Sequence, residues 1–139
     1  MEVITRSFSF HSPAGEIKDI TRLVSDALRE TGLSDGTVTV FVPGATGAVS
    51  TIEYEPGLVE EDLPRALERI APRGEPYGHD AAWHDGNGYS HVRATVLGPS
   101  LTIPFTAKRL TLGTWQQVVF LNLDNRPRDR EIILQFIGK

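Results

Sequence analysis

The chain contains no cysteine, and this absence excludes several kinds of site at once. A disulfide framework, a thiol nucleophile and a cysteine-ligated zinc site all need a residue that the sequence does not have. The chain also lacks a surplus of positive charge, because 14 Lys and Arg residues stand against 18 Asp and Glu residues. A protein that binds the phosphate backbone of a nucleic acid needs a basic surface, so we expect no nucleic-acid partner.

Long hydrophobic runs are missing as well. The longest uninterrupted apolar run is Val118–Leu121, whereas a membrane-spanning helix needs roughly 20 apolar residues. The opening segment, Met1 to Phe8, lacks the basic start and the apolar centre of a signal peptide. We therefore expect a cytoplasmic protein that makes no membrane contact.

The remaining composition is that of one ordinary folded domain. Hydrophobic residues make up 40% of the 139 residues and charged residues 23%, which argues against disorder. A chain of this length can bury a sizeable core without disulfides or a structural metal. We expect a single domain over residues 1–139.

Apolar residues recur at helical spacing in two segments. In the first segment one face carries Ile20, Leu23, Val24, Ala27 and Leu28. Asp19 is the expected N-cap of this helix, and Gly32 is its expected C-terminal stop. A second helix is expected between Leu58 and Ala71, starting near Glu61 or Asp62, because Pro64 must lie in its first turn, where a missing N–H costs little.

Segments of alternating or β-branched residues predict seven strands. They are Val3–Phe10, Thr37–Val42, Val49–Glu55, Val92–Leu97, Leu101–Phe105, Trp115–Leu123 and Glu131–Ile137. Two main helices with a largely antiparallel set of strands predict an α+β fold. Trp115 is expected to belong to its core.

The stretch Pro72–Ser90 shows no periodicity and is predicted to be a long functional loop. Tyr77 and Trp83 argue that this loop is ordered, because each can anchor it. The segment Asp85–Gly88 within it is interpreted as a tight turn, since the twelve-residue ligand series of a calcium loop is absent.

Three of the four histidines and two aspartates fall within 13 residues: His79, Asp80, His84, Asp85 and His91. Imidazole nitrogens and carboxylate oxygens are good ligands of divalent cations, and the same 13 residues contain no Lys or Arg. The spacing matches no standard metal motif. The pattern predicts a divalent metal site, for Zn²⁺ or Mg²⁺, and leaves ordinary hydrogen-bonded loop histidines as an equal alternative.

The segment Pro43–Gly47 is a candidate anion site. A P-loop is excluded, because the segment lies between two predicted strands and lacks Gly-Lys-Ser/Thr. Its amides and the Thr46 hydroxyl can still face an anion, and a plain hairpin connection is the alternative.

Basic residues offer two further candidates. Arg109, followed closely by Gly113 and Thr114, is either a phosphate ligand or an exposed turn residue. The arginines of the segment Arg126–Arg130 alternate with acidic residues, which favours a solvated turn with mixed ion pairs over a binding patch. Gln116 begins an apolar strand and needs a polar partner if it is buried.

Several motifs occur in the order that is typical of the YjbQ-like family. They are Tyr77–Asp80, Ser90–Arg93, Gly98–Leu101, Leu110–Gln117 and Arg130–Gly138. Over about Thr37 to Gly138 the chain resembles this family of small bacterial and archaeal proteins, which are often labelled secondary thiamine-phosphate synthase. The resemblance implies an α+β sandwich-like fold, a homotrimer and a site near the subunit boundary.

The resemblance also implies which residues form the site. His79 and His91 become the best metal-ligand candidates, and many members carry a His where this chain has Ala45. His84 or Asp80 is the candidate to replace that missing ligand. The implied reaction joins a thiazole phosphate to a pyrimidine-methyl group whose diphosphate leaves, which requires cations on the leaving group.

The residues predicted to take part fall into two groups. The catalytic candidates are His79, His91 and Arg109, and the candidates for binding a phosphorylated small molecule are Thr46, Ser90, Ser100, Thr114 and Gln116. The alternative hypothesis is a non-catalytic homotrimer that holds an anion or metabolite. The third hypothesis is a structural trimer that binds no ligand.

Overall fold

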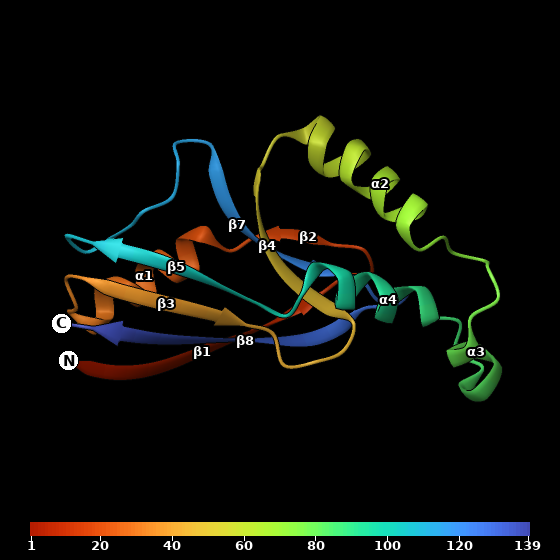
Figure 1. Cartoon of the computed structure of the whole chain (residues 1–139), viewed down its shortest axis with the longest axis horizontal. Coiled ribbons are helices and arrows are strands. Elements are labelled where there is room, and N and C mark those ends of the chain that lie inside the picture. Colours follow the sequence, from red (N-terminus) through yellow and green to blue (C-terminus); the bar gives the residue numbers. More distant parts are fainter.

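The computed structural model describes residues 1–139 and confirms the α+β fold (Figure 1). Every pair of neighbouring strands is antiparallel. One sheet has five strands in the order β1-β8-β3-β5-β6, and the other has three in the order β2-β7-β4. The strands are β1 (Glu2–Ser12), β2 (Ile17–Asp19), β3 (Gly36–Phe41), β4 (Gly47–Glu53), β5 (Ser100–Thr106), β6 (Arg109–Leu110), β7 (Gln116–Asn122) and β8 (Arg128–Gly138).

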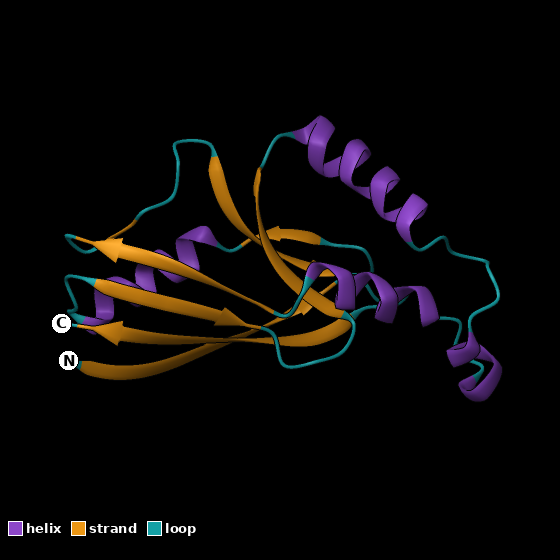
Figure 2. Ribbon diagram, in the orientation of Figure 1, coloured by secondary structure: helices purple, strands orange, loops and turns teal.

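Four α-helices accompany the sheets: α1 (Thr21–Thr31), α2 (Leu63–Ile70), α3 (Gly78–Trp83) and α4 (Gly88–Leu97). A π-helical turn, Leu58–Asp62, leads directly into α2. Figure 2 shows α1 beside the strands, while α2, α3 and α4 gather around the other end of the molecule. Both chain termini lie at the end opposite α3 (Figure 1).

Two apolar cores hold these layers together. The larger core joins α1 and β3 to strands of both sheets, with Phe120 and Phe136 among its fully buried side chains. The smaller core joins β4 and β7 to α2 and α4 through Leu67, Ala94 and Leu121. Strand β7 is buried on both faces, because it lies between the two cores, and this explains its continuous apolar sequence.

The helix predicted around Ile20–Leu28 is confirmed as α1. Gly32 ends it at a φ of 75°, a left-handed conformation that glycine adopts without strain. Ile20, not Asp19, occupies the N-cap position, although the Asp19 carboxylate accepts a hydrogen bond from the Thr21 amide at 3.0 Å. The second predicted helix is confirmed over α2, but its helical path begins earlier, at Leu58.

Three further expectations about the fold are wrong. Val92–Leu97, predicted as a strand, belongs to α4, and part of the predicted loop Pro72–Ser90 forms α3 and the start of α4. Trp115, predicted to be a core residue, is 72% exposed. The short strands β2 and β6 were not among the predicted elements, because two or three residues carry no periodicity.

No helix in the structure is both long enough and apolar enough to cross a lipid bilayer.

Candidate functional site

The histidine-rich segment borders a cavity of about 480 Å³. Helices α3 and α4, the β3–β4 connection and the start of β8 contribute its lining residues. We call His79, Asp85 and His91 the imidazole wall, and we call Thr46, Asp124, Arg128 and Arg130 the arginine wall. Ala45, Trp83, Asn87 and Asp129 complete the lining.

The imidazole wall depends on a close approach between α3 and α4. A Cβ atom at Gly88, the first residue of α4, would lie 2.6 Å from the Cβ atom of Tyr77. Only glycine fits there, and its amide donates a 2.8 Å hydrogen bond to Oδ1 of Asp80. Asp80 therefore fastens α3 to the N-terminus of α4, where a carboxylate is favoured by the free amides.

This junction brings His79 and His91 together. The centroids of their rings are 4.4 Å apart, and the ring planes meet at 39°. Both side chains are half-buried and line the same cavity. Two imidazoles at this separation can offer nitrogen lone pairs to one shared cation.

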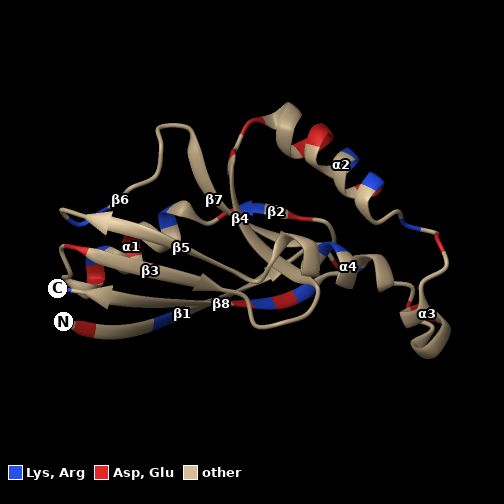
Figure 3. Ribbon diagram, viewed as in Figure 1, with Lys and Arg blue, Asp and Glu red and all other residues tan.

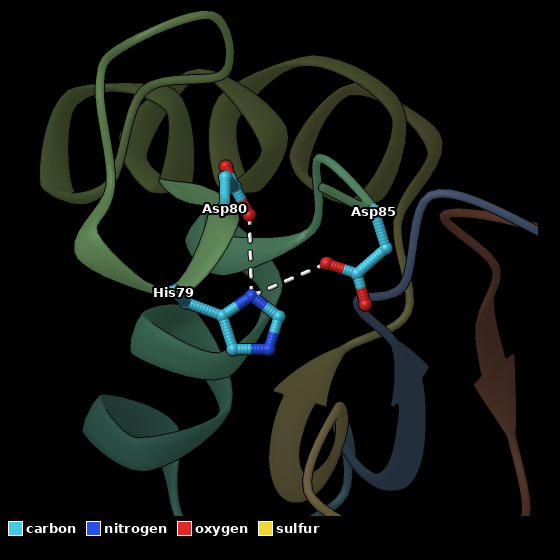
Figure 4. A group of neighbouring side chains, drawn as sticks. All are labelled: His79, Asp80 and Asp85. Carbon is cyan, nitrogen blue, oxygen red and sulfur yellow. Dashed lines mark hydrogen bonds and ion pairs between the residues drawn. The ribbon is translucent and has the colours of Figure 1, made fainter. Parts of the chain in front are cut away.

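Two carboxylates approach the ring of His79 (Figure 4). Its Nδ1 atom lies 3.2 Å from Oδ1 of Asp80 and 3.3 Å from Oδ1 of Asp85. One donor atom from each of the three residues lies within 4.8 Å of the others. Oδ1 of Asp80 already accepts a hydrogen bond from the Gly88 amide. Asp85, in contrast, lines the cavity.

His84 stays outside this cluster. It ends α3 at a φ of 60°, is exposed, and does not line the cavity. The structure therefore gives no geometric support to His84 as the substitute for a ligand at Ala45. Asp80, the other candidate, lies beside His79.

The arginine wall is a buried network centred on Asp124. The Asp124 carboxylate accepts hydrogen bonds from Oγ1 of Thr46 at 2.9 Å, Nδ2 of Asn87 at 3.2 Å and Nε of Arg128 at 2.9 Å. It also accepts from the amide of Asn125 at 2.8 Å. Burial raises the pKa of the Asp124 carboxyl, but these hydrogen bonds outweigh burial and hold the pKa below its ordinary value.

Arg130 is buried beside this network, with 8% of its surface exposed. Its Nη2 atom donates to Oδ1 of Asn122 at 2.6 Å and to Oγ1 of Thr46 at 3.0 Å. Its guanidinium carbon lies 5.6 Å from the centre of the Phe120 ring. The interpretation of Arg126–Arg130 as a solvated turn is therefore wrong at Arg130, although it holds for the exposed Arg126.

One pattern in the sequence could have identified Arg130. Strand β8 buries alternate residues, and Arg130 is in phase with the core residues Ile132, Leu134 and Phe136. Extending that period of two by one step places Arg130 on the inner face. Figure 3 shows the alternating basic and acidic colours at the start of β8, where this phase is set.

The comparisons with known proteins settle the family. The chain matches the family described as "UPF0047 protein YjbQ-like" over residues 6–139. The chain belongs to the UPF0047 YjbQ-like family. A UPF0047 protein of Methanothermobacter thermautotrophicus is 39% identical to it over 140 residues, covering 100% of this chain and 95% of the relative.

Members of the family are also similar in structure. A YjbQ-like protein of unknown function from Sulfolobus solfataricus P2 has a TM-score of 0.89 at 26% identity, covering 99% of this chain and 100% of that one. A hypothetical protein from Aeropyrum pernix K1 has a TM-score of 0.85 at 32% identity, covering 96% of this chain and 99% of that one.

The remaining predicted site residues of this YjbQ-like chain are dispersed. Ser90 is fully buried on α4, and its Oγ atom has no hydrogen-bond partner. Ser100 and Gln116 line a cavity of about 350 Å³ beside β4 and β5. Arg109 lines another, of about 500 Å³, between α1 and β6.

Gln116 does not need the buried partner that its sequence position suggested, because it is exposed, and its Nε2 atom donates to Thr51 at 3.0 Å. Thr114 is exposed in the connection before β7. Strand β6 lies at the end of the molecule opposite α3 (Figure 3). Within one subunit, Arg109 therefore does not line the cavity of His79 and His91, and its catalytic role stays a prediction.

Proposed function

We propose that this YjbQ-like chain is a metal-assisted enzyme that acts on a phosphorylated small molecule in the cavity between the imidazole and arginine walls. The observation that carries the proposal is the 4.4 Å separation of the His79 and His91 rings in the lining of a cavity that Arg130 also lines. Imidazoles suit a divalent cation, and a guanidinium suits a phosphate.

The donor set fits a divalent cation. His79 and Asp85 would hold it, and Asp80, which belongs to the same 4.8 Å group and is fixed by the Gly88 amide, would orient the ring of His79. His91 lies outside that group, but its ring is 4.4 Å from that of His79 and would complete the ligand set. A carboxylate that bonds one ring nitrogen typically leaves the other nitrogen to the metal. Bound there, a cation would supply positive charge against a leaving phosphate or diphosphate.

Thiamine-phosphate synthesis is the specific reaction that we propose to assay first. In it, the bond between the pyrimidine methyl carbon and the diphosphate oxygen breaks, and that carbon bonds to the thiazole nitrogen. The diphosphate leaves with the electron pair of the broken bond. Arg130 and Arg128 lie on the wall where positive charge would stabilise this leaving group.

The proposed homotrimer would supply the residues that one subunit does not bring to the cavity. Arg109, Ser100, Thr114 and Gln116 would then serve the site from a neighbouring subunit, consistent with a site near the subunit boundary. Sedimentation of the purified protein tests the trimer, and a monomer would remove this role from all four residues.

Zinc binding to the metal-free protein, measured by calorimetry, tests the site itself. His79→Ala and His91→Ala should each weaken the affinity by about 100-fold or more, because losing even an outer-shell partner costs roughly 10–100-fold. His84→Asn is the matched control, since Asn tolerates the left-handed backbone there, and it should bind zinc like the wild type.

Turnover of the pyrimidine diphosphate and thiazole phosphate is measured on the same variants. Loss of product in His79→Ala and His91→Ala, with circular dichroism unchanged, would support the enzyme. Full turnover in both variants would contradict it.

A non-catalytic anion-binding protein is the second candidate. Ala45 favours it, because it lines the cavity at the position where the family resemblance implies a His in many members. Phosphate binding without zinc binding and without turnover would select this candidate.

A further inference from the structure

We propose that Arg130 binds a phosphate group in this cavity through its Nη1 atom, and that Asp124 and Thr46 are the residues that position it. The inference rests on the proposed function in placing the ligand in the same cavity. It adds which end of the ligand is recognised and by which atom.

Arg130 has no carboxylate partner. It is 92% buried, yet no Asp or Glu oxygen lies within 4.0 Å of its guanidinium nitrogens, unlike those of Arg128 or Arg93. A buried guanidinium is ordinarily paired with an anion, because burying an unpaired charge is costly. Burial lowers the pKa of Arg130, although the nearby Asp124 opposes this change. Arginine is so strongly basic that the side chain still keeps its charge.

Of the guanidinium nitrogens of Arg130, only Nη2 donates hydrogen bonds within the protein. Nη2 is fixed by acceptors on Thr46 and Asn122, so the plane of the guanidinium is set. Nη1 has no hydrogen-bond partner and lies near Gly44, where a Cβ atom would be 3.4 Å from it. Nε is buried and has no hydrogen-bond partner either. A phosphate oxygen that reaches Nη1 would satisfy a donor that the protein leaves free.

Asn87 supplies a complementary acceptor on the same cavity. Only 3% of Asn87 is exposed, its Nδ2 atom is used by Asp124, and its Oδ1 atom has no partner. A phosphate ester carries acceptor oxygens for Arg130 together with an organic group or hydroxyl that can donate to Asn87. The free Nη1 atom of the buried Arg130 and the free Oδ1 atom of the buried Asn87 belong to residues that line one cavity, and together they indicate a ligand better than either does alone.

The charges of the lining couple phosphate binding to a cation. Three carboxylates, on Asp85, Asp124 and Asp129, face two guanidiniums, on Arg128 and Arg130, so their sum is 2 − 3 = −1. A divalent cation on the imidazole wall changes that sum to +1. We therefore expect zinc to strengthen phosphate binding, and phosphate to strengthen zinc binding by the same factor.

The experiment is a calorimetric titration of the full chain with inorganic phosphate, carried out once with and once without Zn²⁺. Arg130→Gln should weaken phosphate binding by about tenfold or more, because the charge-assisted hydrogen bond from Nη1 is lost. Arg126→Gln is the control: the same charge is removed four residues away from an exposed side chain, and phosphate affinity should stay within about twofold.

A second variant keeps Arg130 in place. Ala45→Glu adds a carboxylate to an exposed position of the lining and should weaken phosphate binding as Arg130→Gln does, even if Arg130→Gln fails to fold. Wild-type phosphate affinity in a folded Arg130→Gln, or in Ala45→Glu, would overturn the inference. Tighter binding of malonate than of phosphate would overturn the assignment to a phosphate group.

The result is separable from that of the proposed function. Phosphate binding that depends on Arg130 in a protein without turnover would keep this inference and remove the enzyme. If turnover depends on His91 but Arg130→Gln leaves phosphate affinity unchanged, the enzyme proposal stands and this inference is overturned.

Discussion

The two walls of the cavity are built in different ways. The imidazole wall comes from one local segment, and its side chains are half-buried or exposed, with Asp85 43% exposed. The arginine wall joins residues that are far apart in the sequence, such as Thr46 and Asp124, and every one of its members except Arg128 is more than 90% buried. The difference indicates that the arginine wall is part of the core, whereas the imidazole wall can adjust around a ligand.

Removing the centre of the arginine wall should give the largest effect. Asp124→Ala leaves Arg128 and the donors of Thr46 and Asn87 without their common acceptor. Leaving a buried donor without its acceptor costs about 1–3 kcal/mol, and Thr46 and Asn87 both lose theirs, so we expect a loss of several kcal/mol in urea unfolding. Asp129→Ala is the control, because its side chain is 94% exposed, and it should change stability by less than about 1 kcal/mol. Equal effects in the two variants would erase the contrast between the walls.

Acid should weaken the arginine wall by protonating Asp124. The pKa of Asp124 is held below its ordinary value in the folded protein, so its carboxylate stabilises the fold above the pKa of the unfolded chain. That stabilisation is lost as the pH falls through the folded-state pKa. Urea unfolding between pH 7 and pH 3 should therefore show a steeper acid loss for the wild type than for Asp124→Asn. Parallel curves would contradict this account of Asp124.

Zinc affinity of the imidazole wall should rise when an imidazole is added at Ala45. Ala45→His adds an imidazole to the cavity lining at an exposed position, so the change places no bulk in the core. We expect zinc affinity to rise by about tenfold, or about 1.4 kcal/mol. Ala45→Gln, which is similar in size but lacks an imidazole, should not have this effect. Unchanged zinc affinity in Ala45→His would separate this position from the metal site.

The smallest effect is expected at the rim. His11 and Asp129 form an exposed pair, with His11 Nδ1 2.9 Å from Asp129 Oδ1. His11→Gln should change the free energy of unfolding by less than about 0.5 kcal/mol, because exposed pairs contribute little. A loss above 1 kcal/mol would mean that the network extends beyond the arginine wall.

The same contrast explains what the sequence could predict. The helical face of α1 and the alternation of β8 are local periodicities, and both were recognised. In α4 the local pattern misled, because Val92 and Val96 face outward while Arg93 and Ser90 are buried. This reversal comes from packing against β4 and β7, which no local pattern contains.

The candidate site divides along the same line. His79 and His91 were predicted because their spacing and residue types are visible within 13 residues. Asp124 and Arg130 were missed, since their partner Thr46 lies 78 and 84 positions away along the chain. Only the strand register brings such distant residues together. Thr46 was predicted as a site residue, but its hydrogen-bond partners Asp124 and Arg130 were not.

The most direct test of a shared metal and phosphate cavity is a crystal structure of the protein grown with Zn²⁺ and phosphate, with anomalous diffraction measured at the zinc edge. We predict an anomalous peak that contacts His79 and His91, and a phosphate between that peak and Nη1 of Arg130. An anomalous peak elsewhere, or His79 and His91 without zinc while phosphate avoids Arg130, would contradict the account.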